Sequence, residues 1–169
     1  ETLCREFDRL VGEGLAINDL PEAMRLMGKG RKVVYLLDNC GEVVFDKLLV
    51  SELKSLGARV IGVVKGEPVL TDVTMEDAKR TGIDALFDEM LSTGGFAVGV
   101  DTKRMGNKLR EEMSSADLII SKGMANFEAL SDSDFRPILY LMRAKCQPVA
   151  EAVGARKDDN VARLVALKR

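Results

Sequence analysis

Hydrophobic and polar positions divide the chain into a short N-terminal part and a longer part in which two periodicities alternate. Between residues 2 and 28, apolar residues recur every three or four positions, which predicts helix with a break at Asn18-Asp19. From residue 31 onward, short apolar runs alternate with helical patterns. The expected strands are 32–37, 60–64, 85–87, 118–120 and 138–142, and the expected helices are 42–56, 72–81 and 103–114. Residues 161–167 fit either a strand or a helix.

Apolar strands that alternate with amphipathic helices predict a parallel sheet covered on both faces. With right-handed crossovers the fold class is α/β: a three-layer α/β/α sandwich with a mostly parallel, Rossmann-like sheet. We expect residues 1–30 to form a short helical N-terminal segment and residues 31–169 to form the α/β domain. The chain opens directly on an apolar helical pattern, which leaves open whether an upstream segment has been removed.

Composition describes an ordinary soluble globular domain and narrows its partners. The 169 residues are 46% hydrophobic and 31% charged, with a net charge of -2. Since there is no basic bias, we expect no nucleic-acid partner. No apolar run approaches the roughly 18 residues of a membrane span, so we expect no membrane partner either. The three cysteines are scattered and include no CxxC pair, which favours a cytoplasmic location.

The chain contains no histidine. This excludes Ser-His-Asp and Cys-His catalysis, as well as HExxH zinc sites. The sequence also lacks the GxxxxGK[ST] and GxGxxG nucleotide-binding loops. An enzyme with this composition would therefore depend on carboxylates, amides, lysines and a hard metal ion.

Polar residues gather where the expected strands end. DNCGE occupies residues 38–42, TDVT occupies 71–74, SKGMANFE occupies 121–128, and RAK occupies 143–145. Because ligands bind beyond the carboxyl ends of parallel strands, we expect these segments to meet at one edge of the sheet. Oxygen-bearing side chains suit Mg²⁺ or Mn²⁺, and lysines complement a substrate phosphate. For any single residue, a turn or helix cap is the alternative, and Cys40 is expected to be a small buried thiol.

Five segments, in this order along the chain, resemble the metal-dependent damage-control phosphatases, a family formerly catalogued as domain of unknown function 89. They are DNCGE at 38–42, DVTMED at 72–77, STGGFAVGVD at 92–101, ADLIISKGMANFE at 116–128 and LMRAKC at 141–146. The resemblance runs from about residue 31 to 150 and is to an archaeal-type member. It implies a domain that binds a divalent metal and hydrolyses phosphate monoesters of small metabolites, of phosphopantetheine or sugar-phosphate type.

The resemblance also implies a set of site residues. The family holds its metal, here Mn, Mg, Co or Ni, with an Asp-Asn pair and a second aspartate, which match Asp38, Asn39 and Asp72. Asp38 would also be catalytic, together with Lys122, whose ammonium suits the phosphate. The substrate-binding residues implied by the resemblance are Glu42, Gly123, Asn126, Glu128 and Lys145. In one departure from the family pattern, Thr71 stands where an asparagine is often seen.

These residues suggest metal-assisted transfer of a phosphoryl group to water. Lys122, with Lys145, would offset charge on the transferring group, and Glu42, Asp77 or Glu128 would orient the water. The small phosphorylated metabolite is the expected partner, and a homo-oligomer remains open.

Three other functions are alternatives to this one. A phospho-aspartate at Asp38, as in haloacid-dehalogenase-type enzymes, is disfavoured because Cys40 stands where a second aspartate is expected. A carboxylate methyltransferase with a Rossmann-like sheet would need a glycine-rich cofactor loop after the first strand, and none is present. A non-catalytic module that binds a phosphorylated metabolite would have the same sequence features, so it stays open.

Overall fold

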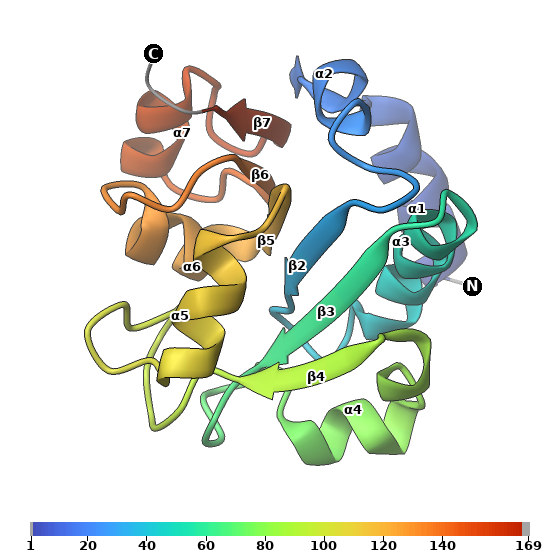
Figure 1. The fold of residues 1–169 in the computed structure, drawn as a ribbon. Helices are drawn as coiled ribbons and strands as arrows, with labels where there is room; N and C mark the ends of the chain where they lie inside the picture. The colour runs from blue at the N-terminus through green and yellow to red at the C-terminus, as the bar shows by residue number, and fades with distance from the viewer. Residues whose placement is uncertain (1, 167–169) are drawn as a thin grey trace.

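The computed structural model of the chain describes residues 2–166, which form one seven-stranded sheet flanked by helices (Figure 1). The strands are β1 (Ile17–Asn18), β2 (Lys32–Leu36), β3 (Arg59–Val64), β4 (Glu89–Ser92), β5 (Leu118–Lys122), β6 (Ile138–Arg143) and β7 (Asn160–Val165). The helices are α1 (Thr2–Glu13), α2 (Leu20–Met24), α3 (Val43–Ser55), α4 (Met75–Thr81), α5 (Asn107–Ser114), α6 (Gly123–Leu130) and α7 (Gln147–Val153), with a short 3-10 helix η1 (Asp84–Leu86).

The strand order is β1-β7-β6-β5-β2-β3-β4, and the neighbouring strands are parallel apart from β6 and β7. The chain builds outward from β2 in two directions: β3 and β4 lie on one side, and β5, β6 and β7 lie on the other. The order therefore reverses between β2 and β5, whose carboxyl ends lie side by side. In doubly wound sheets, ligands bind in the crevice at this switch point.

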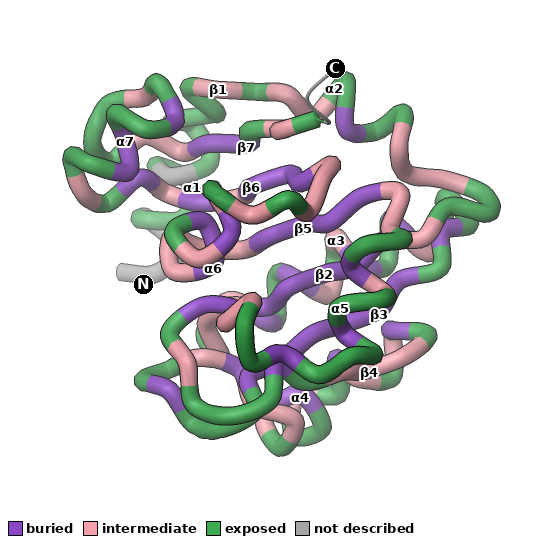
Figure 2. Tube along the Cα trace, turned by 60° about the vertical axis from the view of Figure 1, so that its left-hand side comes forward, coloured by how far each residue is buried: buried purple, intermediate pink, exposed green. Residues whose placement is uncertain are grey.

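Two hydrophobic cores lie on opposite faces of the sheet. On β2, Val33 and Tyr35 belong to the first core, while Val34 and Leu36 belong to the second, as the alternation of side chains along a strand requires. Residues of α2, α3 and α4 complete the first core, and residues of α5, α6 and α7 complete the second. Figure 2 shows the buried residues concentrated along β2, β3, β5 and β6. The three-layer α/β/α sandwich is thus confirmed.

The N-terminal segment is not helical throughout, because residues 17–18 form the edge strand β1. The peptide N–H of Ala16 donates to the carbonyl of Asn160 at 2.9 Å, and that of Asp19 donates to the carbonyl of Ala162 at 2.9 Å. Without β1, strand β7 would lie at the edge of the sheet with unpaired backbone groups, and β1 forms hydrogen bonds with these groups. The division of the chain at residue 30 itself stays a prediction.

The third strand lies later than the sequence pattern indicated. Residues 84–86 form η1, and the strand that pairs with β3 is β4, which starts at Glu89. Phe87 does not belong to a strand, and its apolar side chain packs against β3 instead. A Cβ added to Gly62 would lie 2.7 Å from the ring of Phe87. Residues 160–165 form a strand, while Leu167 lies outside the described residues. No helix within residues 2–166 is long and apolar enough to cross a bilayer.

Candidate functional site

The predicted site residues come from three connections at the carboxyl edge of the sheet. Asp38 and Asn39 follow β2, Asp72 lies in the connection between β3 and α4, and Lys122 ends β5. Gly123 then begins α6. Because β2 and β5 are neighbours at the switch point, Asp38 and Lys122 lie near each other although they are 84 positions apart in the sequence.

A short piece of backbone pairing holds the two acidic connections together. Asn39 lies opposite Asp72 in an isolated antiparallel bridge. Beside it, the peptide N–H of Val73 donates to the carbonyl of Asp38 at 2.8 Å. Residues that face each other in an antiparallel pair lie about 4.5–5.5 Å apart, so the Asp38-Asn39 pair and Asp72 are fixed close together before any ligand binds.

The side chain of Asn39 is held in one orientation by two hydrogen bonds. Its Oδ1 accepts from the peptide N–H of Gly41 at 2.8 Å, and its Nδ2 donates to Oγ1 of Thr71 at 2.5 Å. Thr71, which departs from the family pattern, therefore has a direct contact in this site. Since an amide oxygen carries two lone pairs, Oδ1 of Asn39 retains one that could bind a cation.

Gly123 leaves room for the carboxylate of Asp38. Its φ is +76°, and a Cβ at this position would lie 2.0 Å from Oδ2 of Asp38. Only glycine allows both this backbone conformation and this close approach. Burial, together with the charges of Asp72 and Glu42, raises the pKa of Asp38 to about 6, while Lys65 and Lys122 act in the opposite direction.

Lys65 is a buried ammonium group that the sequence pattern did not single out. It follows β3, is only 3% exposed, and its Nζ lies 3.4 Å from Oδ2 of Asp72. Burial lowers the pKa of Lys65, and Asp72 partly opposes this effect. Its position directly after an apolar strand was the available signal, but a lone lysine there is usually a surface residue.

Lys122 points toward α3. Its Nζ donates to Oδ1 of Asp46 at 2.6 Å and to Oε1 of Glu42 at 3.2 Å. Burial acts to lower the pKa of Lys122, but the two carboxylates outweigh it and the pKa is raised. The ammonium is therefore charged, and it lies within electrostatic range of Asp38.

The donors fit a hard divalent cation of the kind that keeps several waters. Among the residues whose side chains the structure describes, no three His, Cys, Asp or Glu residues converge as a self-sufficient metal cluster. Two carboxylates and the amide oxygen of Asn39 do converge, and such oxygen sets suit Mg²⁺ or Mn²⁺. The charged groups described above comprise four carboxylates and two ammonium groups, so the site carries an excess of negative charge that a cation would relieve.

A hollow of about 240 Å³ lies over Asp38, Asn39 and Asp72. The rest of its wall is formed by Val69, Leu70, Thr71, Val98, Met124, Ala125, Arg143 and Lys145. It combines acidic, apolar and cationic surfaces. Lys145 was expected here, and Arg143 belongs to the same predicted segment but was given no role of its own, whereas Val69, Leu70 and Val98 were not expected. Leu70 is unusual, because it is 94% exposed and has a φ of +50°.

Asn126, Glu128 and Asp77 do not line this hollow. Asn126 is buried, and its Nδ2 donates to the carbonyl of Lys122 at 2.9 Å, so it fixes the start of α6. Glu128 is exposed on α6. Asp77 caps α4 in a capping box with Thr74.

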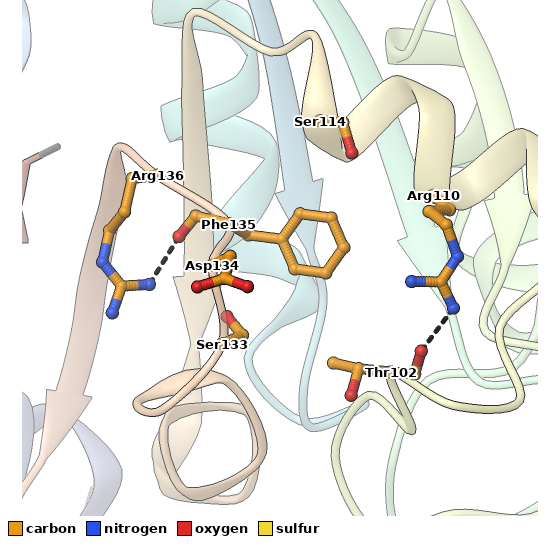
Figure 3. A pocket seen from close by; sticks show the side chains of 7 residues that line it. All are labelled: Thr102, Arg110, Ser114, Ser133, Asp134, Phe135 and Arg136. Carbon is orange, nitrogen blue, oxygen red and sulfur yellow. Dashed lines mark hydrogen bonds between the residues drawn. The ribbon is translucent and has the colours of Figure 1, made fainter.

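A larger cavity of about 440 Å³ lies elsewhere and contains none of the predicted site residues (Figure 3). It lies between α5 and the segment before β6, toward the amino ends of β5 and β6. Figure 3 shows the ring of Phe135 pointing toward α5. The guanidinium of Arg110 donates to the carbonyl of Thr102, and that of Arg136 donates to the carbonyl of Phe135. Both arginines thus stabilise loops by binding backbone carbonyls. The predicted metal-binding residues lie at the smaller hollow instead.

With this geometry established, comparison with known proteins gives the family. The model of the Damage-control phosphatase ARMT1-like domain matches residues 2–161. The chain therefore belongs to this family.

Two curated archaeal relatives carry the damage-control phosphatase name. The Archaeoglobus fulgidus protein is 44% identical over 157 residues, which cover 93% of this chain and 54% of the relative. The Pyrococcus horikoshii protein is 35% identical over 151 residues, which cover 89% of this chain and 52% of the relative. The crystal structure of a DUF89 family protein from P. horikoshii superposes with a TM-score of 0.90 at 33% identity, covering 96% of this chain and 57% of that one. The chain spans about half the length of the curated relatives it matches.

Proposed function

We propose that the chain is the metal-binding α/β part of a phosphatase that hydrolyses phosphate monoesters of small metabolites. The observation that carries the proposal is the convergence of Asp38, Asn39 and Asp72 at the switch point, with the backbone of Gly123 fitted around one carboxylate. Membership of the damage-control phosphatase family supports the same chemistry. Asp38, Asn39 and Asp72 would hold the ion, which we expect to be Mn, Mg, Co or Ni.

When bound, such an ion polarises phosphoryl oxygens and lowers the pKa of a coordinated water. The residues of the chain supply the rest of the chemistry. Lys122 offsets the negative charge of the transferring phosphoryl group, while Lys145 and Arg143 attract the phosphate to the hollow. Because phosphoryl transfer needs mainly positioning and charge stabilisation, this arrangement requires no histidine.

Of the three acids considered for orienting the water, the contacts favour Glu42. Its carboxylate interacts with both Asp38 and Lys122, so it lies beside the proposed reaction centre. Asp77 is occupied as a helix cap, and Glu128 is exposed outside the wall of the hollow.

The residues in the wall of the hollow indicate which esters it could bind. Leu70, Val98 and Met124 offer apolar surface next to the proposed phosphate position. We therefore include both phosphopantetheine-type esters, which carry an apolar part, and sugar phosphates among the candidate substrates. A cytoplasmic location and a homo-oligomeric state stay predictions.

The test is a screen of phosphate release from a panel of these esters, with Mn²⁺, Mg²⁺, Co²⁺ or Ni²⁺ supplied. We expect release with at least one metal and its loss in Asp38→Asn and Asp72→Asn. Asp88→Asn is the control, because Asp88 makes an ion pair with Lys54 at the start of β4, away from the site. Ester binding without release under every condition would instead support the non-catalytic binding module.

A further inference from the structure

Beneath the site, a buried carboxylate joins a tyrosine to the proposed phosphate-binding lysine. Asp46, in the first turn of α3, is 2% exposed. Its Oδ1 accepts hydrogen bonds from the hydroxyl of Tyr35 at 2.7 Å and from Nζ of Lys122 at 2.6 Å. Tyr35 is fully buried in the middle of the sheet, so one end of this chain of contacts is anchored in the core.

The two carboxylates that contact Lys122 are not equivalent. The side chain of Asp46 is buried, whereas that of Glu42 is 38% exposed and its contact with Nζ is longer, at 3.2 Å. An ammonium group has three N–H donors, and these two carboxylates occupy two of them. The buried carboxylate of Asp46 thus holds the ammonium of Lys122 in place, and the ammonium retains one N–H donor for a ligand.

Stability alone does not explain this arrangement. A buried ion pair is commonly no more stabilising than well-packed apolar residues, because both charges must be removed from water. Moreover, Oδ2 of Asp46 is buried without a hydrogen-bond partner among the described residues, which adds to the desolvation cost. Such a cost is typical of functional sites, where it maintains a specific geometry.

We propose that Asp46 and Tyr35 are positioning residues, which hold the ammonium of Lys122 at the carboxyl end of β5 so that it faces a phosphate group bound beside Asp38. The proposal rests on the proposed function. The residue after Lys122 touches the carboxylate of Asp38, so a small displacement of the lysine would misplace its charge relative to the phosphate. Asp46 and Tyr35 act through Lys122 and need not contact the substrate.

The test compares Asp46→Asn and Tyr35→Phe with the unmodified chain. Asp46→Asn keeps the size of the side chain but removes its charge, and we expect kcat/KM to fall about 10- to 100-fold, through both a lower kcat and a higher KM, because the displaced ammonium contacts the phosphate in the ground state as well as in the transition state. Tyr35→Phe keeps the ion pair between Asp46 and Lys122 but removes the hydrogen bond from the tyrosine hydroxyl to Asp46. For this variant we expect kcat/KM to fall about 3- to 10-fold. Calorimetric binding of inorganic phosphate to the Mn²⁺-loaded protein should weaken in the same order, while the affinity for Mn²⁺ itself stays unchanged.

Tyr140→Phe is the matched control. Tyr140 is also fully buried, but on the other face of the sheet, and its hydroxyl has no partner among the described residues. This variant should keep its kcat and its phosphate affinity. Asp46→Glu, which restores the charge, should recover part of the activity that Asp46→Asn loses.

The outcomes separate this proposal from the proposed function. If the unmodified chain releases no phosphate, the proposed function fails, and phosphate binding then decides on the positioning role. Equal phosphate affinity in the unmodified chain and in Asp46→Asn, or binding by neither, would overturn the role. So would a loss of Mn²⁺ affinity that parallels the loss of kcat. If Asp46→Asn does not fold, Tyr35→Phe decides, because it keeps both charges.

Discussion

Replacing Gly123 by alanine should weaken metal binding and slow phosphate release by on the order of 100-fold while the fold persists. The added methyl group would lie 2.0 Å from Oδ2 and 2.4 Å from Cγ of Asp38. A normal contact between these atoms needs more than 3 Å. The carboxylate, or the start of α6 against it, must therefore move by about 1 Å, and misplacements of this size cost on the order of 100-fold in rate.

The substitution also strains the backbone, and this second effect can be separated from the first. A residue with a Cβ costs about 1–2 kcal/mol at a φ of this kind. Gly154 is the matched control: its φ is +77°, against +76° for Gly123, and no atom lies within 4 Å of its added Cβ. Gly154→Ala should thus show the strain alone, as a fall of about 1–2 kcal/mol in the free energy of unfolding.

The assay combines denaturant unfolding, calorimetric titration with Mn²⁺ and phosphate release on all three proteins. We expect both variants to unfold at lower denaturant concentration, but only Gly123→Ala to lose Mn²⁺ affinity and turnover. The reasoning would be refuted if Gly123→Ala bound Mn²⁺ and released phosphate as well as Gly154→Ala does.

Three further predictions concern stability and the wall of the hollow. Asp77→Ala should lower the free energy of unfolding by about 1 kcal/mol through loss of the capping box with Thr74, with Mn²⁺ affinity retained in a titration. The hydrogen bond from the peptide N–H of Lys32 holds the pKa of Asp117 below its usual range. Since a depressed folded-state pKa stabilises above the unfolded value, Asp117→Asn should cost about 1 kcal/mol at pH 7, and this cost should vanish in acid unfolding curves once the pH falls below the folded-state pKa. Leu70→Gly should raise KM for esters with an apolar alcohol more than for sugar phosphates, because it removes an exposed apolar surface from the hollow.

The sequence predicted the sheet well where a strand is buried on both faces. Residues 32–37 and 60–64 are continuous apolar runs for this reason, and they became β2 and β3. The polar segments after such strands indicated the binding edge, because parallel strands share one carboxyl edge. The grouping of Asp38, Asn39 and Asp72 follows from that rule together with the family resemblance.

Features that depend on distant partners were not predictable in this way. The two residues of β1 form a strand only because β7, more than 140 positions later, offers an open edge. Helix α6 starts inside the polar segment 121–128, where the side chain of Asn126 donates to the carbonyl of Lys122. Asp46 was not predicted as a functional residue, since nothing local in the sequence shows that Tyr35 and Lys122 contact it in the core.

The central claim is that Asp38, Asn39 and Asp72 form a divalent-metal site on which phosphate release depends. Its most direct test is the rate of phosphate release as a function of Mn²⁺ concentration, measured on the chelator-treated chain and on Asp72→Asn with the best ester from the screen. We predict no release without metal, a saturable rise as Mn²⁺ is added, and a rise in Asp72→Asn that needs at least about 10-fold more Mn²⁺. Release that is independent of added metal, or identical Mn²⁺ curves for the two proteins, would contradict the claim.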